Sequence, residues 1–205
     1  MACKSTSPHL VNPSGLAMLG ISGVFFAFVP VTSWLAQPSG LLERAVNGVI
    51  SSVAYVSTAG ASGTIAPANQ IAALTALYLG VTYAISGAGS AAATASGNRG
   101  GRDNNNPRAQ NADLKGLPLR LYSAHHHLVE FFPSWAIVAA LTQISAPGDQ
   151  TLINLLGLHV ISKVFVHYPS YLLNVSTTRS LGHILATASV INVAARLANQ
   201  RLLAL

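Results

Sequence analysis

Long uncharged segments, separated by short polar connections, occupy most of this 205-residue chain. A helix needs about 20 apolar residues to cross a hydrocarbon core of about 30 Å. Four segments of about that length predict spans at about 70–90, 118–144, 151–173 and 180–204. The short connections SAPGDQ and NVSTTR favour antiparallel neighbours. We therefore predict an all-α integral membrane protein with a four-helix transmembrane bundle over 67–205, preceded by an extension over 1–66.

The N-terminal extension predicts one additional apolar helix. Residues 15–36 are 22 consecutive uncharged positions, which is long enough to cross a membrane. A targeting segment is the alternative, but only Lys4 precedes this run, whereas transit peptides are rich in arginine. Pro30 lacks a backbone donor and is expected to bend or end the helix. Residues 41–66 are less apolar and predict an interfacial helix followed by a loop.

Composition supports the membrane assignment. Hydrophobic residues make up 51% of the chain and charged residues 8%, too little charge to cover a soluble globule of this size, so the expected partner is a lipid bilayer. The net charge of +6 does not indicate nucleic acid, because the eleven Lys and Arg are mostly scattered at segment ends. The polar loop over 89–117 and Arg179 fall on the same side, which the positive-inside rule makes the inside. A single cysteine, Cys3, excludes an intramolecular disulfide framework and a cysteine-based metal site.

Four titratable residues interrupt the second span, in the stretch LYSAHHHLVEFFPSW. They lie about two turns into the helix, where side chains can reach the headgroup region or a water-filled cleft. His126 and His127 precede Glu130 by four and three positions, so either can hydrogen-bond to it, and His125 points elsewhere. A di-iron centre would need carboxylates from several helices, whereas Glu130 is the single acidic residue of the last three spans. We therefore predict no metal site.

The third span carries a complementary polar stripe. His159, Lys163 and His167 are spaced at i, i+4 and i+8, which places them on one helix face. A lysine inside a span costs about 2.5–3.5 kcal/mol unless it is paired or hydrated, and Glu130 is the predicted partner. The pair is either a structural lock between two helices or part of a ligand site. Polar side chains also open the fourth span and complete a candidate anion pocket; they are Arg179, Ser180 and His183.

The run RLYSAHHHLVEFFPSW, from Arg120 to Trp135, resembles the signature of the MAPEG family, the membrane-associated proteins in eicosanoid and glutathione metabolism. The second-helix pattern of that family has an arginine, Ala-His, an asparagine and a glutamate, followed closely by proline and an aromatic residue. The run DNNNPR, at 103–108, is similar to the loop of a less characterised branch of the family. Arg179 matches the arginine that opens the family's fourth helix, and the resemblance covers roughly residues 70–205.

This resemblance implies a left-handed four-helix bundle, usually a homotrimer, that binds glutathione between subunits. It implies a catalytic role for Arg179, because a positive group beside a thiol favours the thiolate, which is the nucleophile. Glu130 would receive the amino group of glutathione, and Arg120 and His126 would flank its carboxylates. The full set of residues expected to bind glutathione is Arg120, His125, His126, His127, Glu130, Lys163, Ser180 and His183.

Several positions depart from the family pattern. His127 stands where the family has asparagine, and Ser123 stands where many members have arginine. Lys163 replaces the arginine of the third helix and lacks its planar fork for two-point carboxylate recognition. The tyrosine expected one or two turns further along falls at or near Ser170, although Tyr168 and Tyr171 are neighbours.

Two functions fit these residues. The first is a glutathione-dependent transferase or peroxidase that acts on a lipophilic small molecule. The second is a non-catalytic subunit of a larger membrane complex, in which the polar stripe serves structural pairing alone. The departures and the N-terminal extension favour the second function, whereas the retained residues favour the first; these are Arg120, His125, Glu130 and Arg179. In both cases we expect an intracellular organelle membrane, either mitochondrial or of the endoplasmic reticulum.

Overall fold

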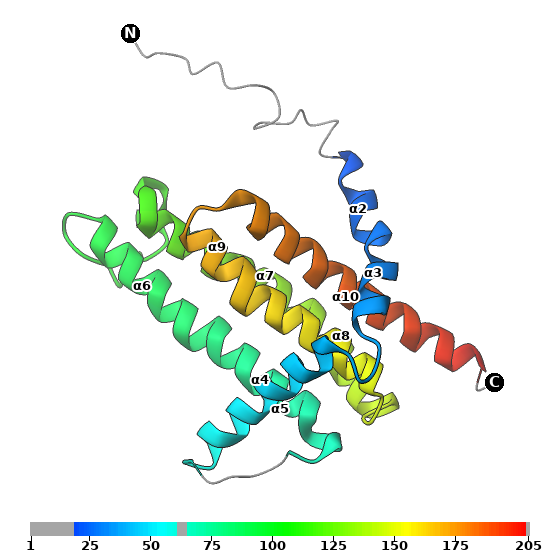
Figure 1. Ribbon diagram of the computed structural model, residues 1–205. Coiled ribbons are helices and arrows are strands. Elements are labelled where there is room, and N and C mark those ends of the chain that lie inside the picture. The colour runs from blue at the N-terminus through cyan, green and yellow to red at the C-terminus, as the bar shows by residue number, and fades with distance from the viewer. Residues whose placement is uncertain (1–18, 61–64, 204–205) are drawn as a thin grey trace.

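The computed structural model describes residues 19–60 and 65–203, so residues 15–18 of the expected N-terminal helix lie outside it. Four long helical segments run side by side as an antiparallel bundle, and shorter helices precede them (Figure 1). The bundle contains α5 (Gln70–Leu79), η2 (Gly80–Ile85), α6 (Ser86–Gly97), α7 (Gly116–Ser145), α8 (Gln150–Ile161), η4 (Ser162–His167), α9 (Tyr168–Leu172) and α10 (Ser176–Leu203). The preceding helices are α2 (Ser22–Ala27), α3 (Val29–Leu35) and α4 (Leu41–Ser57). Short 3₁₀ turns are η1 (Pro67–Asn69) and η3 (Ala109–Asp113), whereas η2 and η4 are π-helical.

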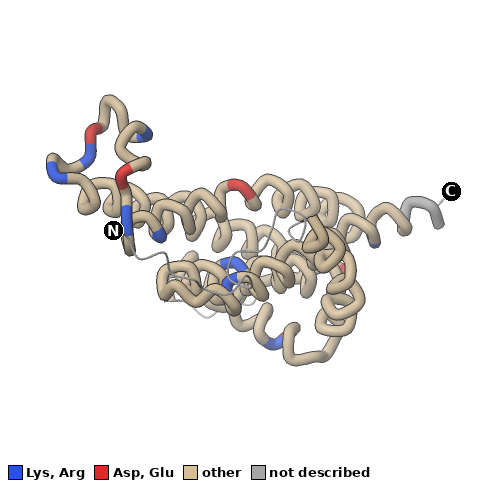
Figure 2. The backbone as a smooth tube through the Cα atoms, turned by 90° about the horizontal axis from the view of Figure 1, so that it is seen from above, with Lys and Arg blue, Asp and Glu red and all other residues tan. Residues whose placement is uncertain are grey.

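Four segments of the described chain are long and apolar enough to cross a membrane. They are Pro67–Gly97, Gly116–Ser145, Gln150–Leu172 and Ser176–Asn199. The expected all-α membrane bundle with four spans is therefore confirmed. Charged positions gather at the end of the bundle that carries the α6–α7 loop (Figure 2). The α9–α10 turn lies at that same end because successive spans alternate in direction.

The first span is longer than the apolar pattern predicts. That pattern ends near residue 90, yet α6 continues to Gly97. Alanine is the best helix former, and this segment is rich in alanine. Small side chains also let α6 approach the start of α7, since a Cβ at Gly97 would come within 2.5 Å of Leu114 Cδ2 and 3.2 Å of Pro118 Cβ. The loop therefore begins at Asn98 instead of Gly89.

The N-terminal apolar helix is present, but it is short and interrupted. It runs from Ser22 to Leu35, which is less than the roughly 20 residues of a span. The helix breaks at Phe28, between α2 and α3, and Pro30 lies in the first turn of α3, where its missing donor is tolerated. The break beside Pro30 agrees with the bend or end expected there.

Two buried asparagines tie this apolar helix to the bundle. Asn192 of α10 donates from Nδ2 to Ser33 Oγ at 2.8 Å and to Thr32 Oγ1 at 3.0 Å. Asn154 of α8 donates from Nδ2 to the Ala36 carbonyl at 3.1 Å. A buried amide that loses its partner costs about 1–3 kcal/mol, so detaching α3 is unfavourable. The N-terminal helices are therefore packed parts of the fold.

The sequence correctly predicts a helix within residues 41–66. This helix, α4, packs against α5 and α8, and its buried positions Val46, Ile50 and Ala54 recur every four residues. It approaches α8 so closely that a Cβ at Gly157 would overlap the Val46 side chain. Glycine is therefore required at this helix crossing.

Large buried side chains form the bundle core. Trp135 of α7 is fully buried, donates from Nε1 to the Leu156 carbonyl at 3.1 Å and packs edge-on against Tyr78 of α5, with centroids 5.3 Å apart. The Tyr78 hydroxyl lies 3.2 Å from His159 Nε2 of α8, so this group joins three spans. Fully buried aliphatic side chains surround it: Leu74, Leu128, Leu152, Ile153, Leu155, Leu156 and Val160.

We expect Gly157→Ala to lower the free energy of unfolding by about 1–3 kcal/mol, because the added methyl group overlaps Val46. A second change, Val46→Ala, vacates the same space and should recover part of the loss. Thermal unfolding in detergent micelles measures both variants. Gly48→Ala on α4 is the matched control, since nothing lies within 4 Å of its Cβ position. Equal unfolding temperatures for Gly157→Ala and the parent would contradict the close α4–α8 crossing.

Candidate functional site

A fully buried lysine lies at the centre of the polar residues. Lys163 Nζ is 3.0 Å from His127 Nε2 of α7 and 3.1 Å from His183 Nδ1 of α10. It also lies over the Phe131 ring, 3.9 Å from the centroid. An ammonium group has three N–H donors and no acceptor. The two imidazoles and the aromatic face are therefore enough to give each N–H a partner. Lys163 therefore joins α7, η4 and α10.

The hydrogen bonds assign a donor or acceptor role to each ring nitrogen in this cluster. Because the Lys163 ammonium only donates, His127 Nε2 and His183 Nδ1 accept. Because a carbonyl only accepts, His167 donates from Nδ1 to the Arg179 carbonyl at 3.0 Å. His159 likewise donates from Nδ1 to a carbonyl of α10 and accepts the Tyr78 hydroxyl at Nε2. The cluster is a set of oriented imidazoles around one cation.

His167 keeps one nitrogen without a partner. Its ring stacks on His127 with centroids 4.3 Å apart and lies edge-on to Tyr171 at 5.8 Å. Its Nε2 is buried and has no hydrogen-bond partner among the residues that the structure describes. With Nδ1 donating, Nε2 is available to accept a proton or a hydrogen bond.

The polar stripe on the third span is confirmed. His159, Lys163 and His167 are all buried, and each bonds to an atom of α10. The π-helical turn η4 carries Lys163 and His167, and a wider turn of this kind is frequent at functional sites. The i, i+4 and i+8 spacing of the three residues does not reveal that η4 is π-helical.

The expected ion pair between Glu130 and Lys163 is not a direct contact, although the Glu130 carboxylate interacts electrostatically with Lys163. Glu130 is exposed, and no ion pair within 4.0 Å involves Lys163 in the described part of the chain. The rotation of α7 directs His127 toward the bundle interior. Glu130, three residues further along, lies about 60° around the helix axis from His127, on the side of α7 that faces an exposed cleft. Lys163 is therefore held by imidazoles instead of a carboxylate.

Glu130 instead lines a polar cleft between α7 and α9. This α7–α9 cleft has a volume of about 390 Å³ and is lined by Tyr122, Ser123, His126, His127, Glu130 and Tyr171. The Arg179 guanidinium lies over the Tyr171 ring, 4.8 Å from its centroid. One carboxylate, two imidazoles and a nearby guanidinium can bind a small molecule that carries both amino and carboxylate groups.

Lys163 and His183 lie in the buried cluster, and three further residues expected at the site do not line this cleft either. Arg120 donates from Nε to the Leu172 carbonyl at 2.9 Å, at the end of α9. His125 points away, as expected, with Nδ1 2.9 Å from Ser86 Oγ of α6. Ser180 is exposed at the start of α10. Their roles in binding stay predictions.

Sequence reasoning missed several aromatic neighbours of the site. Tyr122 packs on His126 at 4.2 Å, one helical turn away, a spacing that could have been noticed. Tyr171, named from the sequence only as a neighbour of the expected tyrosine position, lines the cleft. Phe25 of α2 packs edge-on against His183 at 5.4 Å. Because Phe25 and His183 are far apart in the chain, no local sequence pattern predicts this contact.

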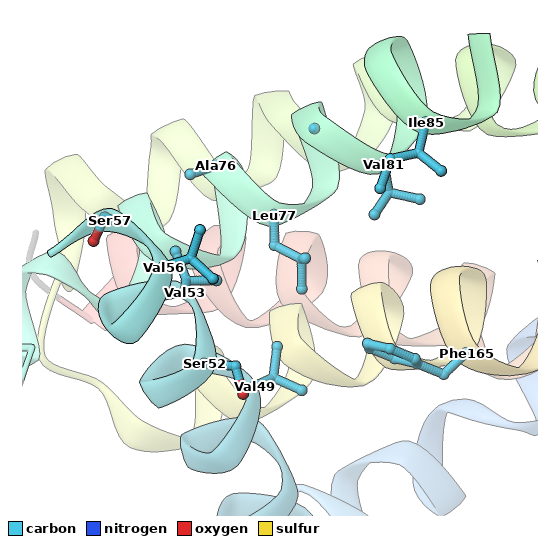
Figure 3. A pocket seen from close by; sticks show the side chains of 11 residues that line it. Val49, Ser52, Val53, Val56, Ser57, Ala76, Leu77, Val81, Ile85 and Phe165 are labelled. Atoms are coloured by element: carbon cyan, nitrogen blue, oxygen red, sulfur yellow. The ribbon is translucent and has the colours of Figure 1, made fainter. Parts of the chain in front are cut away.

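A separate apolar pocket opens between α4, η2 and η4 (Figure 3). It has a volume of about 430 Å³, and Leu77 and Phe165 lie on opposite sides of it. Its two serines, Ser52 and Ser57, bond to carbonyls of their own helix at 2.9 Å and 3.0 Å. The pocket therefore suits hydrocarbon and lacks the polar groups of the α7–α9 cleft.

Comparison with protein families gives one result. The family model described as the MAPEG family matches residues 71–199. This range includes the whole α7–α9 cleft and the Lys163 cluster, and it leaves out α2, α3 and α4. Searches of curated proteins and of solved structures gave no match.

We expect Lys163→Met and His127→Phe to be energetically coupled by about 0.5–3 kcal/mol, because the two residues share a hydrogen bond. Unfolding of the two single variants and the double variant in detergent measures this coupling. His126→Phe is the matched control, since this neighbouring histidine is exposed in the cleft, and its coupling to Lys163→Met should stay within about 0.5 kcal/mol. Additive effects of Lys163→Met and His127→Phe would refute the contact.

Proposed function

The chain belongs to the MAPEG family, and on that premise we propose that it binds glutathione in the α7–α9 cleft. The main support for this proposal is that Glu130, His126 and Tyr171 line one cleft, with Arg179 stacked on Tyr171 beside it. Two of these residues, Glu130 and Arg179, occupy positions where the sequence resembles the family pattern. A carboxylate in the cleft and a guanidinium beside its tyrosine suit a zwitterionic peptide.

The proposed reaction is transfer of the glutathione thiolate to a lipophilic electrophile. Glu130 would bind the amino group, and His126 would bind a carboxylate. Arg179 would stabilise the thiolate, because a nearby positive charge favours the ionised thiol. The thiolate sulfur would form a bond to the electrophilic carbon, and the leaving group would depart with its electron pair. The thiol proton would pass to solvent.

The surroundings support a membrane-soluble second substrate. The cleft is formed by spans of the bundle, so an apolar molecule can reach it from the bilayer. Four of its six lining residues carry aromatic or imidazole rings that accept an apolar neighbour. A homotrimer, in which a neighbouring subunit completes the cleft, belongs to the same proposal.

We expect Arg179→Leu to abolish glutathione thiolate formation while the protein stays folded. The ultraviolet absorbance of bound thiolate near neutral pH, recorded during a glutathione titration, measures the effect. Arg102→Leu is the matched control, because this exposed arginine lies in the α6–α7 loop at the same end of the bundle. Thiolate absorbance that survives in Arg179→Leu would remove Arg179 from catalysis. If millimolar glutathione gives the parent protein neither thiolate absorbance nor a higher unfolding temperature, the proposed activity is wrong.

One observation favours the non-catalytic alternative. Lys163 stands where the resemblance implies an arginine, and its N–H donors are directed at His127, His183 and Phe131. That position therefore has no donor left for a glutathione carboxylate. In this alternative the protein is a structural subunit of a larger membrane complex. The outward side chains of α2–α3, among them Phe26 and Val31, would contact another subunit.

If the protein is a structural subunit, the double change Phe26→Ser and Val31→Ser should release it from a large assembly. Both side chains are exposed, so the change should leave the fold intact. Native electrophoresis after extraction in mild detergent measures the assembly size. Leu173→Ser is the matched control, since this exposed leucine lies in the α9–α10 turn, away from α2. A parent protein that migrates only as a monomer or homotrimer would contradict the structural role.

A further inference from the structure

A second polar cleft lies at the opposite end of the bundle from the α6–α7 loop. It has a volume of about 630 Å³ and lies between α3, the start of α8 and the last turns of α10. Its lining residues are Val29, Pro30, Ser33, Trp34, Gln37, Pro38, Thr151 and Arg196. We call it the Arg196 cleft. It shares no residue with the α7–α9 cleft.

The Arg196 cleft lies at the level of the membrane surface. Arg196 precedes the polar sequence Asn199-Gln200-Arg201 by three residues, or about 4.5 Å of helix. Thr151 is the second residue of the α8 span. Two independent spans therefore place the cleft at the headgroup region. Trp34, which lines the cleft and is 67% exposed, is a residue type enriched at this depth.

The guanidinium of Arg196 is held in place but lacks a counter-ion. Its Nε donates to Asn192 Oδ1 at 3.0 Å, and one terminal nitrogen donates to Ser33 Oγ at 3.3 Å. Arginine has five N–H donors, so three remain. Among the residues that the structure describes, no carboxylate lies within 4.0 Å of it. The acidic residue closest in sequence to the lining residue Thr151 is Asp149. Its carboxylate accepts a hydrogen bond from the Leu152 amide as a helix cap.

Other donors converge on the same space. The side-chain amide of Gln37 and the hydroxyl of Thr151 line the cleft, and neither side chain has a hydrogen bond within the described part of the chain. The Trp34 indole adds an N–H, which can only donate. A half-buried guanidinium with several unused donors fits an oxyanion with oxygens in several directions.

We propose that the Arg196 cleft binds the phosphate of an anionic phospholipid headgroup. A bilayer supplies phosphodiester groups at this depth, where an unpaired arginine otherwise remains without an anion. The cleft contains no carboxylate that could hold the choline group of a zwitterionic lipid, so a phosphatidylglycerol headgroup is preferred over phosphatidylcholine. The lipid would also brace α3 against α8 and α10, because Ser33, Thr151 and Arg196 come from these three helices.

Native mass spectrometry of the purified full chain tests this site with phosphatidylglycerol, phosphatidylcholine and inorganic phosphate as separate probes. The parent should retain phosphatidylglycerol in preference to phosphatidylcholine. Arg196→Leu should weaken that binding about tenfold, the effect of losing one charge-assisted hydrogen bond. Arg102→Leu, an exposed arginine at the other end of the bundle, should bind as the parent does.

A second variant separates lipid binding from folding, because Arg196→Leu also removes the bonds of Arg196 to Asn192 and Ser33. The double change Gln37→Leu and Thr151→Val leaves those bonds intact and should weaken phosphatidylglycerol binding several-fold without lowering the unfolding temperature. Equal lipid binding by the parent and both variants would overturn the site. Retention of inorganic phosphate without retention of phosphatidylglycerol would overturn the lipid assignment and leave a site for soluble phosphate.

Discussion

The arrangement of the polar residues depends on one buried ammonium group. Lys163 lies in a span, is fully buried and has no carboxylate partner within 4.0 Å in the described chain. A charge in that environment is costly unless every donor is used, and only the approach of α7 and α10 to η4 provides two imidazoles and an aromatic face. The relative rotation of three helices therefore follows from the hydrogen bonds of one side chain.

That rotation also creates the candidate site. Since His127 turns inward to accept from Lys163, its neighbours His126 and Glu130 turn toward the α7–α9 cleft. The structural cluster and the cleft are thus two sides of the same segment of α7, and His127 belongs to both. A change in the cluster would reach the cleft through His127 and through Tyr171, which packs against His167. Stability and ligand binding are coupled at these positions.

The N-terminal helices extend the family bundle without entering its cleft. The family match begins at residue 71, yet α3 is joined to α10 and α8 through Asn192 and Asn154. Amide side chains inside a membrane protein are stable where their donors meet fixed acceptors, and here they specify where α3 sits. The extension covers α10 and leaves the α7–α9 cleft open. It also forms one wall of the Arg196 cleft.

The sequence alone determined the membrane environment, the four spans, the family and the polar stripe, because apolar length, local motifs and helical spacing are properties of neighbouring residues. It placed the first loop too early, since a segment rich in alanine and glycine gives a weak apolar signal although alanine forms helix well. Only the tertiary structure decided which partner Lys163 takes. Charge complementarity pointed to Glu130, but helix rotation sets the partner, and that rotation results from packing over all four spans. The Asn192, Phe25 and Arg196 contacts likewise join segments far apart in the chain, so no local pattern contains them.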